Sequence, residues 1–264
     1  LRHPGSDLGV FQKALAKAGL TENSILNARR AHSTIAGYLE LHIEQGNRLN
    51  TSADDIAVVT SIVGLRRQKV TYIGRADHAG TISMKERRDA GQGAAALMLS
   101  SRRLVMKEFP ESVVNTGTIE FSPGAMNIVP QRAQLTLEFR APKPHDLEQL
   151  GVALQQLVYT EARERELDVT IEEVDGIQPV QMNGQVQAAF VAAAEQLDLR
   201  HKRMASGAGH DAQVMAKICP AGMIFVPSVD GCSHSAREFT EWEDCINGAN
   251  VLLQTAVAGI PSAD

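Results

Sequence analysis

The stretch GYLELHIEQG, residues 37–46, alternates apolar and polar side chains with a period of two. That period predicts a β-strand whose two faces differ. Three aliphatic side chains share the face expected to pack into a core: Leu39, Leu41 and Ile43. The opposite face carries Glu40, His42 and Glu44, and an amide, Gln45, follows just before a glycine. Because ligands of open α/β sheets bind beyond the carboxyl ends of the strands, this strand end is a candidate binding site.

The segment from residue 64 to residue 176 follows its own regular pattern. We predict its strands from two-residue alternation and its helices from long runs rich in alanine and leucine. In chain order these are a strand at 66–76, a helix at 87–109, strands at 113–122 and 132–141, a helix at 145–166 and a strand at 167–176. The order β-α-β-β-α-β is typical of a ferredoxin-like unit, in which two helices cover one face of a four-stranded sheet.

The chain on either side of this unit reads as an α/β domain. Before the unit we predict a helix at 6–20, with Ser6 or Asp7 as N-cap, and a buried strand at 56–64. After it we predict helices at 183–197 and 209–218, a buried strand at 221–227 and a helix at 240–260 that opens with a Thr240–Glu243 capping box. The sequence therefore predicts an α/β fold divided into 1–63, 64–176 and 177–264, with the middle part inserted.

Composition and charge exclude several classes of function. The 264 residues are 44% apolar, which is enough for sizeable cores, and the formal net charge is −5 at pH 7. A negative charge argues against a surface that binds nucleic acid or an anionic membrane. No apolar run approaches the length of a transmembrane helix, and the polar start LRHPGSDLG does not resemble a signal peptide. The three cysteines form no CxxC pair, so we expect reduced thiols in a cytoplasmic protein.

Four of the eight histidines lie where chemistry is expected. His42 and His78 lie at predicted strand ends, His234 follows the strand at 221–227, and His210 lies in a glycine-rich turn that opens a predicted helix. A single histidine after a strand is more often an ordinary surface residue, and we interpret the other four in that way: His3, His32, His145 and His201. Because Walker, GxSxG, HExxH and GxGxxG motifs are missing, the pattern alone favours only a hydrolase or a metal enzyme.

Five segments together resemble one family in order and spacing. They are LELHIEQG (39–46), RADHAGTISMKERRDA (75–90), SPGAMNIVPQRAQLTLEFR (122–140), SGAGHDAQVMA (206–216) and MIFVPSVDGCSHSAREFT (223–240). This set is similar to the amidase/carbamoylase family, which comprises allantoate amidohydrolases, N-carbamoyl-L-amino-acid hydrolases and β-ureidopropionases. The resemblance covers the chain from about residue 37 to its end. It implies a metallopeptidase-like α/β domain interrupted by a ferredoxin-like lid, through which two subunits form a homodimer.

The resemblance also implies a role for each matching residue. His42 and His234 match metal ligands, one for each ion of a divalent pair such as Zn²⁺ or Mn²⁺. Gln45, Asn127 and Arg140 match substrate-binding residues, with Arg140 taking the substrate carboxylate. Gly209 and His210 match contacts to the ureido group or the carboxylate, and His78 matches a histidine that reaches in from the partner subunit to stabilise the oxyanion.

The function implied is metal-dependent hydrolysis of a linear ureido or amide C–N bond. The junction GIQPVQMNG (176–184) resembles that of allantoate amidohydrolases, which makes allantoate the favoured substrate. The alternatives within the family are N-carbamoyl-L-amino-acid hydrolase and β-ureidopropionase. An alternative of another class is a binding or dimerisation module without activity. We expect a small ureido substrate and a second copy of the chain as partners, and neither nucleic acid nor membrane.

Two departures from the family pattern qualify these expectations. The family's other metal ligands and its glutamate base belong to GSHxDT-like and EEG-like segments, and this sequence contains neither. We therefore expect the chain to lack the family's N-terminal part, to bind metal weakly on its own and to show little hydrolysis. The motif HAGTISM also lacks the Thr-Pro pair common before its methionine, which leaves the loop around His78 less constrained.

Overall fold

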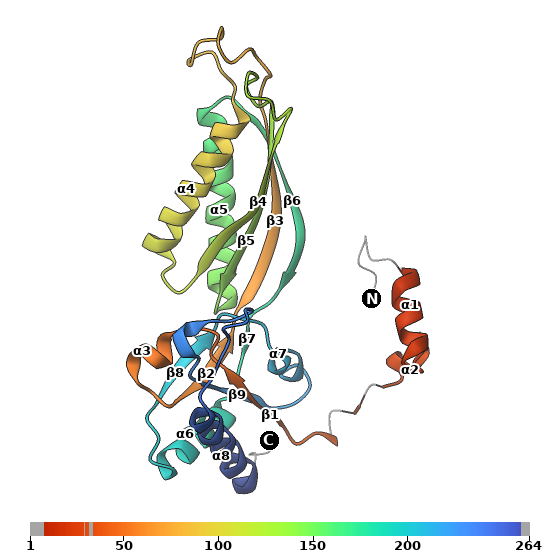
Figure 1. The fold of residues 1–264 in the computed structure, drawn as a ribbon, viewed down its shortest axis with the longest axis vertical. Coiled ribbons are helices and arrows are strands. Elements are labelled where there is room, and N and C mark those ends of the chain that lie inside the picture. Colours follow the sequence, from red (N-terminus) through yellow and green to blue (C-terminus); the bar gives the residue numbers. More distant parts are fainter. Residues whose placement is uncertain (1–7, 29, 32–33, 260–264) are drawn as a thin grey trace.

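The computed structural model describes residues 8–28, 30–31 and 34–259, and this part of the chain forms two β-sheets (Figure 1). The chain starts in one sheet, passes into the other at Gly64, and returns after Ile177. The second sheet is therefore an insertion in the first, as the sequence predicts. The division into independent domains at these joints stays a prediction. The predicted N-cap, Ser6 or Asp7, lies outside the described residues, as do His3 and His32.

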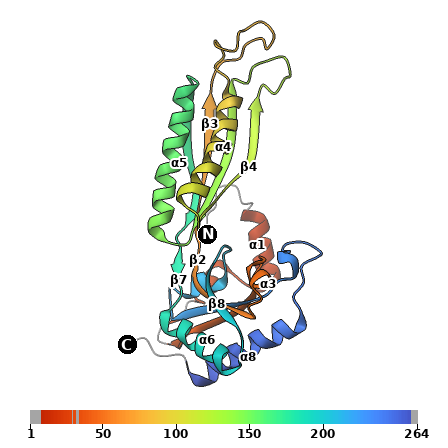
Figure 2. The same cartoon turned by 90° about the vertical axis from the view of Figure 1, so that its left-hand side faces the viewer.

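The inserted sheet has four strands in the order β4-β5-β3-β6, and each neighbouring pair is antiparallel. Its strands are β3 (Gly64–Ile73), β4 (Val113–Ser122), β5 (Arg132–Ala141) and β6 (Asp168–Ile177), and its helices are α4 (Ala90–Glu108) and α5 (Pro144–Glu164). Both helices cover the same face of the sheet (Figures 1 and 2). This arrangement confirms the predicted ferredoxin-like unit.

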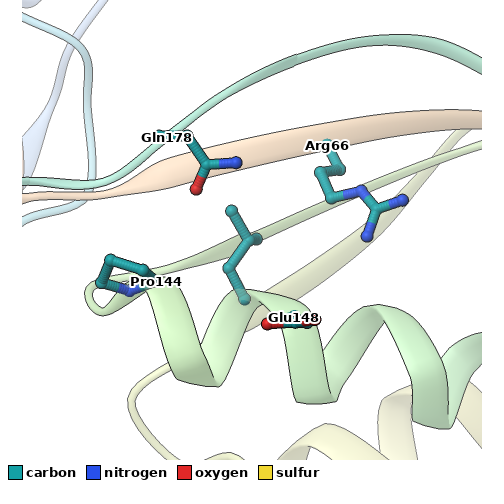
Figure 3. Close-up of a pocket in the computed structure, with 5 residues that line it drawn as sticks. Arg66, Pro144, Glu148 and Gln178 are labelled. Carbon is teal, nitrogen blue, oxygen red and sulfur yellow. The ribbon is translucent and has the colours of Figure 1, made fainter.

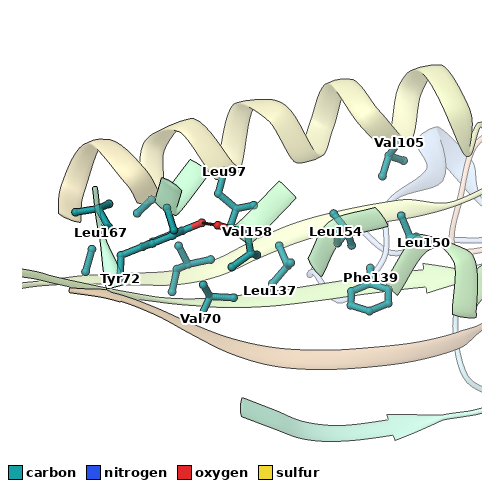
Figure 4. Close-up of a cluster of buried hydrophobic side chains, with 14 of the residues drawn as sticks. Val70, Tyr72, Leu97, Val105, Leu137, Phe139, Leu150, Leu154, Val158 and Leu167 are labelled. Carbon is teal, nitrogen blue, oxygen red and sulfur yellow. Dashed lines mark hydrogen bonds between the residues drawn. The ribbon is translucent and has the colours of Figure 1, made fainter. Parts of the chain in front are cut away.

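The core of this unit follows from the two-residue alternation of β5, whose alternate side chains are all buried. They pack against buried leucines of the two helices, including Leu97 and Leu150 (Figure 4). The Tyr72 hydroxyl lies in this core and donates a hydrogen bond to the Val158 carbonyl oxygen at 3.1 Å, so its polar atom is satisfied. Asp89 caps α4 by accepting hydrogen bonds from two main-chain N–H groups of its first turn.

The other sheet has five strands, with β1 at one edge, β9 next to it and β2 beyond. The strands are β1 (Tyr38–Ile43), β2 (Ile56–Ile62), β7 (Val180–Gln181), β8 (His201–Ser206) and β9 (Ala221–Val226). β1 runs parallel to β9, and β8 runs parallel to β2, while β2 and β9 are antiparallel. The sheet is therefore mixed, and the parallel pair β1–β9 brings the loops that follow these two strands to the same edge.

Helices lie on both faces of the five-stranded sheet. They are α3 (Arg48–Ser52), α6 (Gly184–Gln196), α7 (Asp211–Met215) and α8 (Trp242–Ala258); α1 (Leu8–Lys17) and α2 (Glu22–Leu26) lie apart from both sheets (Figure 1). Leu39, Leu41 and Ile43 are partly buried and all pack against the core cluster of α6 and α8, which confirms that they share one face of β1. Gly248 permits this packing, because a Cβ there would lie 2.5 Å from Leu41 Cδ1. In the described part of the chain, no helix is long and apolar enough to span a membrane.

The sequence did not predict α3 or β7, and two further features of this sheet and its helices differ from the prediction. β8 was not predicted, because its HKRMAS sequence is charged and lacks an apolar alternation. The predicted capping box at Thr240 does not form, because α8 begins at Trp242 with Glu241 as its N-cap, so this prediction is wrong. The Thr240 hydroxyl instead donates to the Pro227 carbonyl oxygen at 3.0 Å and ties the preceding loop to the end of β9.

The four-stranded unit depends on one buried face of its sheet, so substitutions on its two faces have unequal effects. Leu137→Ala removes a fully buried side chain and is expected to lower the free energy of unfolding by about 2–5 kcal/mol. Val174→Ala, at a 52% exposed position of β6, is the matched control and is expected to change it by less than about 0.5 kcal/mol. Equal effects in urea denaturation would contradict this assignment of the core.

Candidate functional site

The candidate site lies at the carboxyl end of β1 and β9. His42 is the penultimate residue of β1 and lies beside Phe225 of β9 in the parallel register. The chain after β1 stays bound to β9 and the loop that follows it: Glu44 N–H donates to the Val226 carbonyl at 2.9 Å, and Gln45 N–H donates to Ser228 Oγ at 3.0 Å. The loops that carry Gln45 and His234 are therefore held together beside His42.

The imidazole of His42 is fixed in one tautomer. Its Nδ1 lies 2.8 Å from the carbonyl oxygen of Ile43. A carbonyl oxygen only accepts, so Nδ1 carries the proton and Nε2 keeps its lone pair. A neutral imidazole whose far nitrogen is bare has the form required of a metal ligand. The local geometry therefore supports the predicted chemistry of His42.

His210 lies directly against His42, with ring centroids 4.5 Å apart and ring planes at 71°. Its side chain is 2% exposed, and its Nε2 lies 2.8 Å from Ser206 Oγ. The pKa of His210 is lowered to about 4, first by burial and then by the neighbouring His42, while Asp211 opposes both. His210 is therefore neutral at pH 7.

Gln45 and His234 both adopt left-handed backbone conformations, with φ of 57° and 55°. Non-glycine residues in this region are uncommon and gather at functional sites. The main-chain N–H of His234 donates to Glu238 Oε2 at 3.0 Å. That bond is the largest cause of the lowered pKa of Glu238, and the imidazoles of His234 and His42 contribute to it. The hydrogen bond from the His234 N–H thus ties Glu238 to the loop of His234.

Arg140 comes from the four-stranded sheet and reaches the five-stranded one. Its Nη1 donates to the Gly207 carbonyl oxygen at 2.8 Å, one residue beyond Ser206. Its Nε and Nη2 donate to Glu138 Oε1 at 2.9 and 2.7 Å. Both Arg140 and Gly207 line a cavity of about 560 Å³ between the two sheets. The other charged side chains around this cavity are three cations and one anion: Arg48, Lys143, Arg203 and Glu111.

His78 and Asn127 lie together, but not with the other candidates. They follow β3 and precede β5, and the Ala79 N–H donates to the Asn127 carbonyl at 2.9 Å. Arg140 lies at the opposite end of β5, and the ten residues of β3 separate the two ends by roughly 30 Å at about 3.3 Å per residue. Within the described chain, His42, Gln45, Gly209, His210 and His234 therefore lie on or next to the five-stranded sheet, and Arg140 reaches it through Gly207. His78 and Asn127 lie instead in the loops that follow β3 and precede β5, at the far end of the four-stranded sheet (Figure 1).

The two glutamates of the opening strand have structural partners. Glu40 Oε2 accepts a hydrogen bond from the Ala212 N–H in the first turn of α7 at 2.7 Å. Glu44 is buried and accepts from the N–H groups of Arg48 and Leu49, both at 2.8 Å, at the start of α3. Each carboxylate caps a short helix beside the site. Sequence reasoning left them unassigned, because α3 has no apolar period that would reveal it.

Sequence reasoning also missed Ser206 and Glu138, which hold His210 and Arg140. The Glu138–Arg140 pair had a signal, since residues two apart on a strand share one face. Ser206 lies four residues before His210, a spacing that carries no information until the strand at 201–206 is recognised.

The donor set partly fits a metal. His42 offers a bare Nε2, and imidazole is a common ligand for Zn²⁺ and similar ions. However, across residues 8–28, 30–31 and 34–259, no three His, Cys, Asp or Glu side chains gather in a way that could hold an ion. The described residues therefore provide single ligands and no complete metal centre.

A second cavity, of about 350 Å³, lies at the start of α5 (Figure 3). It is lined by Arg66, Pro144, Leu147, Glu148 and Gln178. Arg66 already pairs with Glu173, with 2.5 Å between Nη2 and Oε1. None of the eight predicted site residues, all of which the structure describes, lines this cavity. The cavity that contains Arg140 is therefore the one relevant to the predicted chemistry.

Comparison with known proteins gives matches along nearly the whole described chain. The model of peptidase family M20/M25/M40 matches residues 8–258. The N-carbamoyl-L-amino acid amidohydrolase of Geobacillus stearothermophilus is 37% identical over 243 residues, which cover 92% of this chain and 59% of that protein. The allantoate amidohydrolase of Bacillus subtilis (strain 168) is 36% identical over 253 residues, which cover 95% of this chain and 61% of that protein.

Solved structures give the same result for the fold. An amidase of the hydantoinase/carbamoylase family from Burkholderia multivorans is similar with a TM-score of 0.81 at 34% identity. The match covers 87% of this chain and 56% of that one. This chain thus spans about three fifths of the length of the curated relatives named above.

The lowered pKa of His210 predicts a pH dependence of stability. In the unfolded chain, the imidazole of His210 takes up a proton near pH 6.5. In the folded chain, this imidazole stays neutral until the pH falls to about 4. Unfolding therefore binds a proton in this window, and the free energy of unfolding falls as the pH drops from 6.5 to 4, by roughly 3 kcal/mol at most for this group.

Urea denaturation across this range measures the effect. We expect His210→Gln to flatten the slope, and His145→Gln, which removes an exposed imidazole, controls for the loss of a histidine. An unchanged slope in His210→Gln would show that His210 takes up its proton equally in both states.

Proposed function

Because the chain belongs to peptidase family M20/M25/M40, we propose that it carries substrate-binding and metal-binding parts of an amidohydrolase that cleaves a linear ureido or amide C–N bond. The resemblance to the amidase/carbamoylase family, predicted from five motifs, is confirmed by these relatives. The observation that carries the proposal is the contact between Arg140 and Gly207, which brings an arginine of one sheet to the loop that holds His210 beside His42.

The geometry of Arg140 suits a substrate carboxylate. Glu138 and Gly207 leave one N–H on Nη1 and one on Nη2 without a partner among these contacts, and two such groups bind a carboxylate bidentately. Although burial opposes it, hydrogen bonds from Arg67 and Arg140 lower the pKa of Glu138, so its carboxylate stays charged and keeps the guanidinium in place. The cationic surroundings of the cavity also favour an anionic substrate.

We propose a homodimer as the working form, because His78 and Asn127 are too far from Arg140 to meet one substrate within a chain. β4 is an edge strand with exposed apolar side chains, including Ile119 and Phe121, and such an edge can pair with a second copy. His78 Nδ1 accepts a hydrogen bond from the Gly80 N–H at 3.0 Å, so the neutral ring carries its proton on Nε2. That N–H is the donor that an oxyanion in the partner's site requires.

His42 and His234 are proposed as one ligand for each of two divalent ions, Zn²⁺ or Mn²⁺. A bound pair would polarise the carbonyl group of the substrate and activate a water molecule. The residues of this chain hold the substrate: Arg140 binds its carboxylate, Asn127 and Gln45 bind its polar groups, and His78 donates to the developing oxyanion. The remaining ligands and the general base belong to the GSHxDT-like and EEG-like segments of the family.

Allantoate is the favoured substrate, because the junction at 176–184 resembles that of allantoate amidohydrolases. N-carbamoyl-L-amino acids and β-ureidopropionate are the alternatives. Relatives named for allantoate and for N-carbamoyl-L-amino acids are almost equally similar to this chain. Ammonia release from a panel of these compounds decides among them. A dimer that holds no metal and hydrolyses none of them would support the alternative of a binding or dimerisation module.

Arg140→Gln, made in the protein at the full length that its gene encodes, tests the carboxylate contact. It removes charge-assisted hydrogen bonds, so we expect KM for a ureido acid to rise roughly 10- to 100-fold while kcat changes little. Arg132→Gln, at the other end of the same strand, is the matched control and leaves KM unchanged. A fall in kcat with KM unchanged would place Arg140 outside substrate binding.

Mixing two inactive variants tests whether the site is completed by a second chain. In a mixed dimer of His42→Ala and His78→Ala, the His78→Ala chain keeps His42 and receives an intact His78 from its partner. Random mixing is therefore expected to restore roughly a quarter of the wild-type activity. If the mixture stays inactive although mass spectrometry shows mixed dimers, both histidines act within one chain.

A further inference from the structure

We infer that Ser206 is a positioning residue that locks His210 in its Nε2–H tautomer, so that His210 supports the ring of His42 and has no N–H to give to a substrate. The inference rests on the proposed function for the role of His42. It concerns residues that the sequence does not link, because Ser206 ends an unpredicted strand. It also narrows the predicted role of His210, which the family resemblance describes as a contact to the ureido group or the carboxylate.

The hydrogen bonds around Ser206 determine where the protons lie. Its hydroxyl oxygen is 2.9 Å from the carbonyl oxygen of Ala208 and 2.8 Å from His210 Nε2, and it accepts from the Ala208 N–H at 3.1 Å. A carbonyl oxygen only accepts, so the single hydroxyl proton points to Ala208. The contact to His210 is then a hydrogen bond only if Nε2 donates. All three contacts are satisfied by one tautomer.

Within the part of the chain that the structure describes, no hydrogen bond is found for the other nitrogen of His210. Nδ1 lies 3.8 Å from Glu40 Oε1, too far for a hydrogen bond, and Glu40 Oε2 is held by the Ala212 N–H. Ser206 is 1% exposed and the His210 side chain 2% exposed, so water does not compete readily for these atoms. The short glycine-rich loop between the two residues is therefore closed by hydrogen bonds to the serine hydroxyl.

The locked ring is one of three that pack together. His210 lies 4.5 Å from His42 and 5.5 Å from Phe225 between ring centroids, and His42 lies 6.5 Å from Phe225. His42 is also held by the carbonyl of Ile43 through Nδ1. One hydrogen bond and one edge-on ring contact thus set the direction in which His42 Nε2 points. Releasing His210 from Ser206 removes one of these two restraints.

The tautomer has a consequence for substrate recognition. A carboxylate needs donors, and the only N–H of the His210 ring is donated to Ser206, so of the two side chains His210 and Arg140 only Arg140 can donate to a substrate carboxylate. His210 could meet a ureido N–H only as an acceptor through Nδ1. That nitrogen faces Glu40 instead. The structure thus assigns to His210 the support of a predicted ligand.

The direct test is ¹⁵N NMR of the histidine-labelled protein at the full length that its gene encodes. Long-range ¹H–¹⁵N correlations report which imidazole nitrogen carries the proton. We expect Nε2–H for His210 in the wild type and in Ser206→Thr, and a shift towards Nδ1–H in Ser206→Ala. Nδ1–H in the wild type would overturn the lock, whether or not any variant folds, and so would an unchanged pattern in a folded Ser206→Ala.

Zn²⁺ affinity, measured by competition with a chelating dye, tests the support of His42. Loss of an outer partner of a metal ligand typically weakens binding about 10- to 100-fold, which we expect for Ser206→Ala but not for Ser206→Thr. Ser100→Ala is the matched control, because Ser100 is also buried and donates to a main-chain carbonyl, far away in α4. Unchanged Zn²⁺ affinity in Ser206→Ala, with a shifted tautomer, would overturn the support role.

These measurements do not depend on turnover. If the protein hydrolyses no ureido compound but shows the expected tautomers, the proposed function fails and the lock stands. If it hydrolyses them while His210 carries its proton on Nδ1, the lock fails and the proposed function stands.

Discussion

The antiparallel ladder of the four-stranded sheet is the constraint on which the rest of the arrangement depends. Its strands run without interruption from the joint between the sheets to the tip, and two long helices pack along one face. Such a unit is stiff, because β3 and β5 are paired along their whole length and the side chains between the sheet and the helices form a buried core. Arg140 is fixed at one end and His78 at the other, so no local rotation of side chains can bring them together.

In the five-stranded sheet, parallel pairing brings residues together instead of holding them apart. Because β1 and β9 end side by side, two loops that are distant in sequence meet beside His42. The carboxylates nearby are used as helix caps, Glu40 for α7 and Glu44 for α3, and each satisfies N–H groups that a buried helix start would otherwise leave without partners. The two neighbouring histidines are held as opposite tautomers by a carbonyl and a serine. The polar atoms around the site are therefore oriented by the fold before any ligand binds.

The sequence predicted the parts of this molecule that depend on periodicity. The alternation of β1, the buried face of β5 and the order of strands and helices in the inserted unit all follow from side chains that repeat every two or about 3.6 residues. β8 and α3 were not predicted, because β8 is charged and α3 is one short turn without an apolar stripe. The capping box predicted at Thr240 was wrong, because a hydroxyl that can cap a helix can also donate to a carbonyl across a loop. The Thr240 hydroxyl donates to the Pro227 carbonyl oxygen instead.

Prediction of the candidate site was limited by a different cause. Motifs identify residue types, but a tautomer or an arginine orientation depends on partners that only the fold brings near. Ser206 and Glu138 are examples: both act on a neighbour within four residues, yet neither has a distinctive sequence context. The separation of His78 from His42 likewise follows from strand direction and length, which become visible only when the sheet order is known.

We propose that one functional site combines His42 of one chain with His78 of a second chain. A distance measurement tests this arrangement most directly. Spin labels at position 47, after β1, and position 81, in the loop of His78, are compared by double electron–electron resonance in two samples. Doubly labelled chains diluted with unlabelled protein report the distance within a chain, and an equal mixture of singly labelled chains reports the distance between chains. We predict a long distance within the chain, of roughly 30 Å or more, and a clearly shorter one between chains. A short distance within the chain, or no short distance between chains, would contradict it.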